Sequence, residues 1–518
     1  MKLDANRILK NTIALYLRMG VMMLVTLYTS RVVLKALGVD DFGIFNIVGG
    51  IATFLAFLNG SAISATQRFL NFELECGSTQ NLRRLFSMCV NIHAIIAGVI
   101  LIVGEIVDVT VLNFYLNIPD GKMYAANWVY QFSLLSFCIT ILRAPYEAAI
   151  VAKEKMGVFA YISILEATVR LAVAFSLIYT PFDKLIFYAV ATMLSTAIIC
   201  GSFWLYTVKS FDFTKYMPVW DGSLCKKLLN FSAWSIAGEM SNIVNAQGTS
   251  IALNIFKGVA VNAAMGLAEQ VNAAISRFVA NFQVAFAPQI TKLYAGGNFG
   301  DLHKLVKMSA KISLILSTIL AIPIILNCNL ILEIWLGKYP EFTEGFVVVT
   351  ILYTITSAIN APMWIAIKAT GNIKIYQLIV SIANTLNLLP LILLLHAGIS
   401  PVWALASKIA VNLITTIWRS YYVAGKISMS GNYYTICVIL KFLLIGGISI
   451  FLPYIGLKHF GYSVLNGIIF TALGEIILIA ATYFFGLDEH EIQAVRMRIA
   501  RLWAKLSGKV LPNREIKL

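Results

Sequence analysis

Charged residues are scarce in this 518-residue chain. Only 13% of its residues are Asp, Glu, Lys or Arg, against about 25% in ordinary soluble domains, while 59% are hydrophobic. The mean hydropathy is strongly positive, at +0.81. A soluble protein of this composition could not cover its surface with polar groups. The composition therefore excludes a soluble globular protein and indicates a polytopic membrane protein.

Motifs for metal, redox and nucleotide chemistry are also missing from the sequence. The seven cysteines are scattered without a C-x-x-C pair, and the five histidines never reach the spacing of metal ligands. Neither a Walker loop nor a G-x-G-x-x-G motif occurs, which argues against direct use of ATP. We therefore expect no cofactor, no metal site and a protein that is not an enzyme.

Long apolar runs are what the sequence does contain. A helix needs about 20 apolar residues to cross the hydrocarbon core of a bilayer. Fourteen such runs occur, over residues 11–36, 42–67, 85–107, 123–144, 157–180, 185–208, 228–254, 262–290, 305–328, 345–368, 375–396, 401–424, 433–457 and 463–486. They are continuously apolar rather than alternating, which favours helices over a barrel. The sequence predicts an all-α polytopic membrane protein with about 14 transmembrane helices.

The distribution of basic residues predicts the orientation of these helices. If the N-terminus is cytoplasmic, 27 of the 40 Lys and Arg residues fall in the cytoplasmic loops and the C-terminal tail, and six fall in the opposite loops. This bias follows the positive-inside rule and places both termini in the cytoplasm. It also accounts for the net charge of +15 without a nucleic-acid partner.

An internal repeat divides the predicted helices. Residues 144–150 read APYEAAI and residues 361–367 read APMWIAI, at corresponding places in the two halves. Parallel repeats of this kind are common in secondary transporters. The predicted organisation is therefore a six-helix lobe (1–209), a cytoplasmic linker (210–227), a second six-helix lobe (228–425), an additional helix pair (433–486) and a basic tail (487–518).

The tail is predicted to be an amphipathic helix. Asp488 and Glu491 suit an N-cap and capping box, and apolar residues then recur at spacings of three and four among arginines and lysines. Such a helix lies on an anionic membrane surface. A helix that binds a protein partner is the alternative.

Polar and ionisable residues inside the predicted spans indicate an aqueous cavity. Three spans carry them at helical spacing, on one face each, and ionisable groups at bilayer depth usually face a cavity. The candidate cavity cations are Arg18, Arg277 and Lys408, and the other candidate cavity residues are Glu239, Glu269, Asn242, Asn272 and Asn412. Cations in a site of low dielectric suit an anionic substrate. One of the carboxylates could carry a coupling H⁺ or Na⁺.

Structural roles are open alternatives for several of these residues. Glu166 and Arg170 are four residues apart and can form an ion pair within one helix. Arg18 could extend to the inner interface, and Arg277 could pair with Glu269.

Four stretches of the sequence are similar to those of a known transporter family. They are TSRVVLKALGVDDFGIFNIV (29–48), ATQRFLNFEL (65–74), RAPYEAAIVAKEKM (143–156) and LLNFSAW (228–234). Through them the chain resembles, over nearly its whole length, the polysaccharide transporter family of the multidrug/oligosaccharidyl-lipid/polysaccharide exporter superfamily. This family includes O-antigen and capsular polysaccharide flippases.

The resemblance implies a two-lobed, MATE-like protein of the bacterial inner membrane. Such a flippase turns undecaprenyl-diphosphate-linked oligosaccharides from the inner to the outer leaflet by alternating access, for O-antigen (lipopolysaccharide), capsule or exopolysaccharide biosynthesis. The implied partners are membrane lipids, polysaccharide polymerase and glycosyltransferases. In related lipid II flippases cavity arginines meet the diphosphate, and Arg18 best matches that arrangement.

Two other functions are compatible with parts of the sequence. A multidrug cation exporter of the same fold would favour an aromatic and acidic cavity, against which the intramembrane Arg and Lys residues argue. A membrane-embedded polysaccharide polymerase or ligase would need a sizeable external loop, and the predicted outer loops are short.

Overall fold

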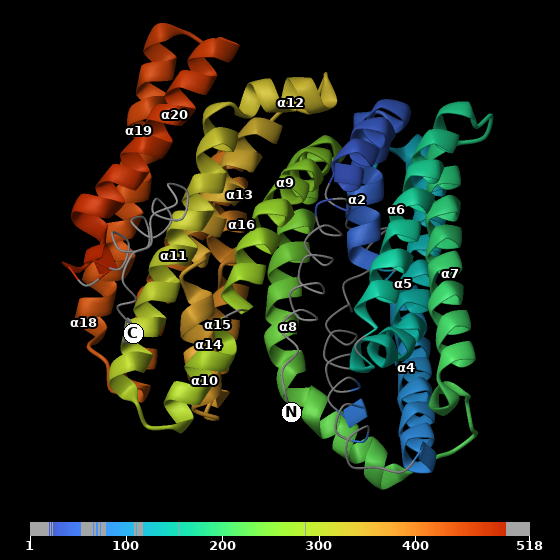
Figure 1. Cartoon of the computed structure of the whole chain (residues 1–518). Helices are drawn as coiled ribbons and strands as arrows, with labels where there is room; N and C mark the ends of the chain where they lie inside the picture. The colour runs from blue at the N-terminus through green and yellow to red at the C-terminus, as the bar shows by residue number, and fades with distance from the viewer. Residues whose placement is uncertain are drawn as a thin grey trace, which may run out of the picture. The chain divides into compact units, whose positions relative to one another are not determined.

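The computed structural model describes residues 20–493 apart from 21, 23, 53–65, 67–68, 71–72, 74–78, 108–109, 111–115, 117, 154, 285 and 490 (Figure 1). The side chains of residues 52, 120, 156, 227–239, 281, 284, 287, 288, 292 and 295 are not described either. The described part of the chain is almost entirely helical and contains no strand. The predicted all-α fold is therefore confirmed.

Ten helical segments are long and apolar enough to cross a membrane. Six are single helices: Thr79–Val107 (α4), Met123–Ala152 (α5), Gly157–Tyr179 (within α6, Met156–Tyr179), Lys184–Ser210 (α7), Phe299–Leu326 (α11) and Pro401–Lys426 (α17). Two consist of a pair of α-helices: Thr343–Ala369 contains α13 (Thr343–Ser357) and α14 (Asn360–Ala369), and Lys374–His396 contains α15 (Lys374–Leu386) and α16 (Leu388–His396). The last two include a π-helical piece: Gly431–Phe460 contains α18 (Gly431–Tyr434), η4 (Thr435–Leu440) and α19 (Lys441–Phe460), and Val464–Gly486 contains α20 (Val464–Ala481) and η5 (Thr482–Gly486). Each corresponds to one of the predicted runs.

The predicted number of fourteen spans is not confirmed. The runs over 11–36 and 42–67 lie partly outside the described residues, although a helix covers 24–37 and α2 covers Val39–Ala52. The runs over 228–254 and 262–290 correspond to α8 (Gly222–Lys257) and α9 (Val259–Val284), which have 36 and 26 residues. Both are long enough to span a bilayer but are not among the ten, because polar residues interrupt their apolar sequence.

The contacts divide the chain into two compact units. Unit 1 comprises 1–277, 329–353 and 372–415, and unit 2 comprises 278–328, 354–371 and 416–518. Four of the boundaries fall inside helices, namely α9, α12 (Cys328–Leu336), α13 and α17. The division into two six-helix lobes made from the internal repeat stays a prediction.

Within unit 1, apolar side chains of α2, α4, α5 and α7 form a continuous core. Ile44, Tyr130, Ile141 and Leu185 are among its fully buried members. The hydroxyl of Tyr130 is not left unsatisfied in this core, since it donates to the carbonyl of Gly104 at 2.7 Å. This packing places α2 against the rest of the first half of the chain.

Hydrogen bonds also connect the two halves of the chain at one end of unit 1. The Arg31 guanidinium donates to the carbonyl of Ile334 at 2.9 Å, and the Trp335 indole donates to the carbonyl of Leu27. Ser30 donates to the side chain of Gln270. The helix over 24–37 is thereby joined to α12 (Cys328–Leu336), which follows the end of α11 that the charge pattern predicts to be outer, and to the middle of α9.

Glycines allow α2 to approach α8 and α9 closely at the same end. A Cβ atom on Gly43 would lie 2.1 Å from the carbonyl oxygen of Val259, at the start of α9. Further along the helices, Gly50 faces the side chain of Gln247, and Gly266 faces Asn46. Any larger residue at position 43 would therefore force the backbones apart.

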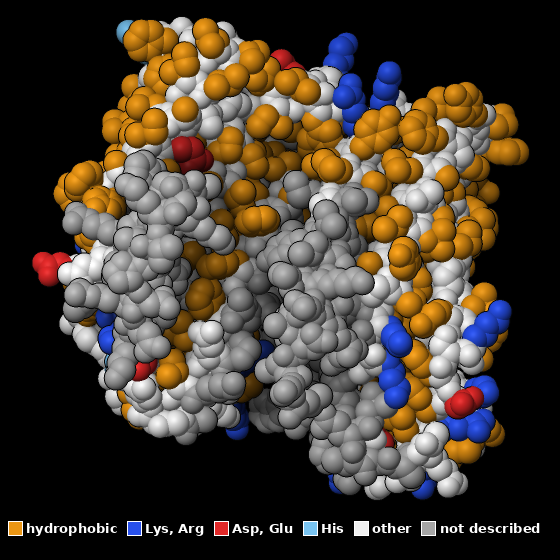
Figure 2. Space-filling view, viewed as in Figure 1, with side chains coloured by type: hydrophobic (Ala, Val, Ile, Leu, Met, Phe, Trp, Pro, Cys, Tyr) orange, Lys and Arg blue, Asp and Glu red, His pale blue; other side chains and the backbone are white. Residues whose placement is uncertain are grey.

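Unit 2 is built around α11, α19 and α20. Ile322, Leu326, Leu457 and Leu478 form its buried apolar cluster. The opposite surfaces of α19 and α20 carry many exposed hydrophobic side chains, as the orange patches over these helices in Figure 2 show. Exposed apolar helix faces are expected where a helix meets lipid.

The beginning of the C-terminal tail contacts α11 in unit 2. The Lys311 side chain, only 5% exposed, has its ammonium 2.7 Å from a carboxylate oxygen of Glu491 and 3.3 Å from one of Asp488. The backbone N–H of Asp488 donates to the Glu491 carboxylate at 2.9 Å. This is the bond that the capping-box pattern predicts. The amphipathic helix predicted beyond residue 493 lies outside the described residues.

Candidate functional site

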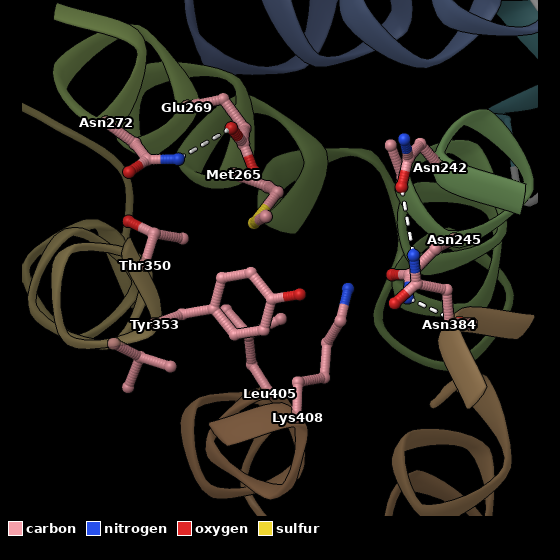
Figure 3. Close-up of a pocket in the computed structure, with 12 residues that line it drawn as sticks. Asn242, Asn245, Met265, Glu269, Asn272, Thr350, Tyr353, Asn384, Leu405 and Lys408 are labelled. Carbon is pink, nitrogen blue, oxygen red and sulfur yellow. Dashed lines mark hydrogen bonds between the residues drawn. The ribbon is translucent and has the colours of Figure 1, made fainter. Parts of the chain in front are cut away.

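A polar pocket lies within unit 1, between α8, α9, α13, α15 and α17 (Figure 3). Its volume is about 260 Å³. Eight of its lining residues are polar or ionisable, namely Asn242, Asn245, Glu269, Asn272, Thr350, Tyr353, Asn384 and Lys408; Ala246, Met265, Val349 and Leu405 are apolar. The lining offers amides, hydroxyls, one ammonium and one carboxylate.

Lys408 extends from α17 into this pocket, and α8 holds its ammonium group. Its Nζ donates to the hydroxyl of Thr249 at 2.8 Å, and that hydroxyl donates in turn to the carbonyl of Asn245 at 2.6 Å. Thr249 is fully buried. No carboxylate of the described residues forms an ion pair with Lys408. The pocket therefore contains a positive charge that hydrogen bonding positions but no described anion neutralises by contact.

Amide side chains connect α8 to α15 along one side of the pocket. The Asn384 amide donates to the side-chain oxygen of Asn242 at 3.0 Å, and the Asn245 amide donates to the backbone carbonyl of Asn384 at 2.6 Å. The last turn of α15 lies here, just before the helix is interrupted at Asn387. Pro390, in the first turn of α16, favours this interruption because it has no N–H to continue the helical pattern.

The carboxylate of the pocket belongs to α9. Asn272 donates to Glu269 at 3.4 Å, three residues along the same helix. Glu269 and Lys408 project into the pocket from different helices, with the Tyr353 ring near Lys408 (Figure 3). The site therefore combines one cation and one anion with several neutral hydrogen-bonding groups, an arrangement suited to binding a polar molecule.

Four of the predicted cavity residues lie in this pocket: Asn242, Glu269, Asn272 and Lys408. Asn412 is buried one turn beyond Lys408 on α17 and does not line the pocket. Arg277 is exposed on α9 and is also absent from the lining. Arg18 lies outside the described residues, and the side chain of Glu239 is not described.

Glu166 and Arg170 belong to a separate charged cluster in unit 1. The Arg170 guanidinium is 2.5 Å from a carboxylate oxygen of Glu166, while Arg143 lies 3.9 Å from the other. Arg143 is also 3.3 Å from Glu147 on its own helix, α5. The cluster is electrically balanced and does not line the pocket.

Sequence reasoning missed several residues of the pocket. Asn245 and Thr249 continue the polar face of Asn242 at spacings of three and four, so the sequence contains a signal for this part of the stripe. Asn384 belongs to a neutral polar stripe as well, since Gln377 and Ser381 precede it at spacings of four and three, and Tyr353 follows Thr350 by three residues. These stripes contain no ionisable residue, and the structure shows that α13 and α15 turn part of them into the pocket.

The position of the Lys408 ammonium is expected to depend on the hydroxyl of Thr249. Thr249→Val keeps the shape of the side chain but removes the acceptor. The Lys408 ammonium then loses a charge-assisted hydrogen bond of about 1.5–3 kcal/mol, so we expect at least a several-fold loss of transport. Thr249→Ser retains the hydroxyl and should keep most of the activity. Initial transport rates of both variants at equal protein level provide the measurement. Equal rates for the Val and Ser variants would refute this role.

Comparisons with known proteins give a likeness of fold only. No model of a protein family matches the sequence, and no curated protein sequence matches it. Among solved structures, the chain is similar to the lipid II flippase MurJ in an inward closed conformation, with 14% identity, a TM-score of 0.63, and coverage of 92% of this chain and 98% of that chain. It is also similar to an inward-facing multidrug resistance MATE family transporter of the MOP superfamily, with 14% identity, a TM-score of 0.61 and coverage of 79% and 97%.

A third similar structure is a ligand complex of the MATE multidrug transporter DinF-BH, with 14% identity, a TM-score of 0.58 and coverage of 82% and 97%. At these identities the chain shares the MATE- and MurJ-like fold, as the sequence predicts. The chain is thus a multi-pass membrane protein with the fold of MOP superfamily transporters.

Proposed function

We propose that the protein is a flippase that moves undecaprenyl-diphosphate-linked oligosaccharides from the inner to the outer leaflet of the bacterial cytoplasmic membrane. The observation that carries this proposal is the pocket around Lys408. A positioned ammonium surrounded by amides and hydroxyls suits a polar, anionic and hydroxyl-rich headgroup better than an organic cation. The shared fold with a lipid II flippase supports a lipid-linked substrate.

The contacts between the two halves of the chain support transport by alternating access. Arg31, Trp335 and Gly43 join helices at the end of unit 1 predicted to face outward, while the pocket lies further along α8 and α9. Opening these contacts would expose the pocket to the outer side. In the proposed cycle, both termini are cytoplasmic and a coupling H⁺ or Na⁺ supplies the driving force.

The proposed pathway is the assembly of O-antigen, capsule or exopolysaccharide. Glycosyltransferases would complete the lipid-linked oligosaccharide on the cytoplasmic side, and a polysaccharide polymerase would use it after translocation. Membrane lipids would surround the apolar outer faces of helices such as α19 and α20.

A reconstituted assay tests this function. Proteoliposomes that contain the full-length protein and a fluorescent undecaprenyl-diphosphate-linked oligosaccharide are sampled with a membrane-impermeant glycosidase, with and without an imposed proton or sodium gradient. We expect faster loss of the inner-leaflet pool than in protein-free liposomes. Unchanged lipid-linked sugar together with uptake of a cationic dye would instead identify a multidrug exporter.

A further inference from the structure

We infer that the pocket around Lys408 binds one sugar residue that carries a single carboxylate, such as a hexuronic acid, and does not bind the diphosphate of the carrier lipid. This inference rests on the proposed function, because it assigns the pocket to one part of the proposed substrate.

The charges of the pocket favour a ligand with one negative charge. Lys408 is the one cation and Glu269 the one carboxylate among the described lining residues. A diphosphate carries at least two negative charges, and it would meet a single ammonium together with repulsion from Glu269. Recognition of phosphate groups typically uses arginine forks or several charge-assisted donors. A single carboxylate can instead pair with Lys408 one to one, and its smaller charge meets less repulsion from Glu269.

The hydrogen-bonding capacity of Lys408 leaves room for such a carboxylate. An ammonium has three N–H donors, and the described residues accept only one of them, through Thr249. The Nζ atom projects toward the space between Tyr353 and Asn245 (Figure 3). An incoming carboxylate would thus accept from an ammonium that Thr249 already holds in place. The Lys408 side chain would therefore lose less conformational entropy on binding.

The remaining polar atoms of the pocket include both acceptors and donors. Asn245 and Asn384 each use one N–H of their amides in a bond between α8 and α15, and their side-chain oxygens can accept from a ligand. Glu269 accepts one bond from Asn272 and has a second oxygen. Such acceptors need hydroxyl donors, which a sugar supplies and an ionised phosphate lacks. A diphosphate placed here would leave these acceptors without a donor from the ligand.

The volume of the pocket sets the size of the portion that it holds. At about 260 Å³ it is smaller than the ~300–1,000 Å³ of pockets that enclose drug-sized ligands. It therefore accommodates one residue of an oligosaccharide rather than the whole repeat unit. The carboxylated residue would be the part of the substrate that the pocket selects.

Binding of three probes to the purified full-length protein tests this assignment. The probes are a disaccharide that ends in glucuronic acid, its neutral counterpart that ends in glucose, and inorganic pyrophosphate, each titrated in nanodiscs at neutral pH. We expect the acidic disaccharide to bind at least ten-fold more tightly than either other probe. Lys408→Met should reduce its affinity to that of the neutral disaccharide, whereas Lys257→Met, which removes an exposed lysine at the end of α8, should not.

The outcomes separate this inference from the proposed function. Equal binding of the two disaccharides, stronger binding of pyrophosphate, or no binding of any probe would overturn the assignment even if the protein flips lipid-linked sugars. If size-exclusion chromatography shows that Lys408→Met is unfolded, the relative affinities of the wild-type protein for the three probes are sufficient to test the assignment. A protein that prefers the acidic disaccharide but moves no lipid-linked sugar would leave the assignment standing and refute the flippase.

Discussion

Replacement of Gly43 by alanine is expected to abolish most transport. The added Cβ would lie 2.1 Å from the oxygen and 2.8 Å from the carbon of the Val259 carbonyl. These are backbone atoms at the junction of α8 and α9, so no side-chain rotation can make room. Overpacking of a well-packed site costs about 1–3 kcal/mol and occasionally more. Here α2 must separate from α9, which would disrupt the contacts that close this end of unit 1.

The matched control is Gly98→Ala on α4. A Cβ on Gly98 would have no atom within 4 Å, and alanine is favoured over glycine in a helix by about 0.5–1 kcal/mol. We therefore expect Gly98→Ala to leave the transport rate and the melting temperature unchanged or slightly raised. Both variants are compared by thermal unfolding in detergent and by transport in proteoliposomes. A Gly43→Ala protein with the behaviour of Gly98→Ala would contradict the close approach of α2 to α9.

The second large effect is expected at Lys311. Asp488→Asn combined with Glu491→Gln would leave the Lys311 ammonium buried against α11 without the two carboxylates that now contact it. Loss of the partners of a buried charge destabilises a protein by about 3–5 kcal/mol. We expect a clear fall in the melting temperature of the double variant relative to the wild-type protein, with both measured at the same pH.

A third substitution distinguishes this electrostatic effect from simple disruption of the tail. Adding Lys311→Met to the double variant removes the uncompensated charge and should restore most of the lost stability, because apolar replacements of buried ion pairs are often neutral or stabilising. The control is Lys304→Met, which removes a mostly exposed lysine from the same helix and should have little effect. A triple variant as unstable as the double variant would disprove the ion-pair explanation.

The helices could largely be predicted from the sequence because their signal is local. Ten apolar runs correspond to ten helices of sufficient length and apolarity, and each run by itself meets the requirement of the bilayer core. The helices over 374–396 and 343–369 show what such reasoning leaves out. Each consists of two helical pieces, and the length and apolarity of a run do not show where it breaks, although Pro390 is a local signal for the break at Asn387.

The pocket could be predicted only in part because it depends on which helix faces meet. Glu269 and Asn272 lie three residues apart on α9, so their side chains share a face. Arg277 follows Glu269 by eight residues, which places it about 12 Å along the axis and rotated by roughly 80°, on the other side from Asn272. A difference in rotation of this size is enough to turn one side chain into the pocket and another to the surface of α9. Which of the two outcomes applies to Arg277 can be stated only when the helices packed against α9 are known.

The polarity of α8 and α9 has a consequence for how the protein enters the bilayer. The insertion machinery samples helices largely one at a time, and a charged residue near the middle of a helix costs about 2.5–3.5 kcal/mol on insertion scales for Asp, Lys or Arg. On their own, α8 and α9 are therefore poor candidates for release into lipid. The nearest membrane-spanning helices before and after them in the chain, α7 and α11, are strongly apolar. We expect α8 and α9 to remain at the insertion site until α11 has been synthesised. The polar residues of the pocket would then also delay the release of these two helices into lipid.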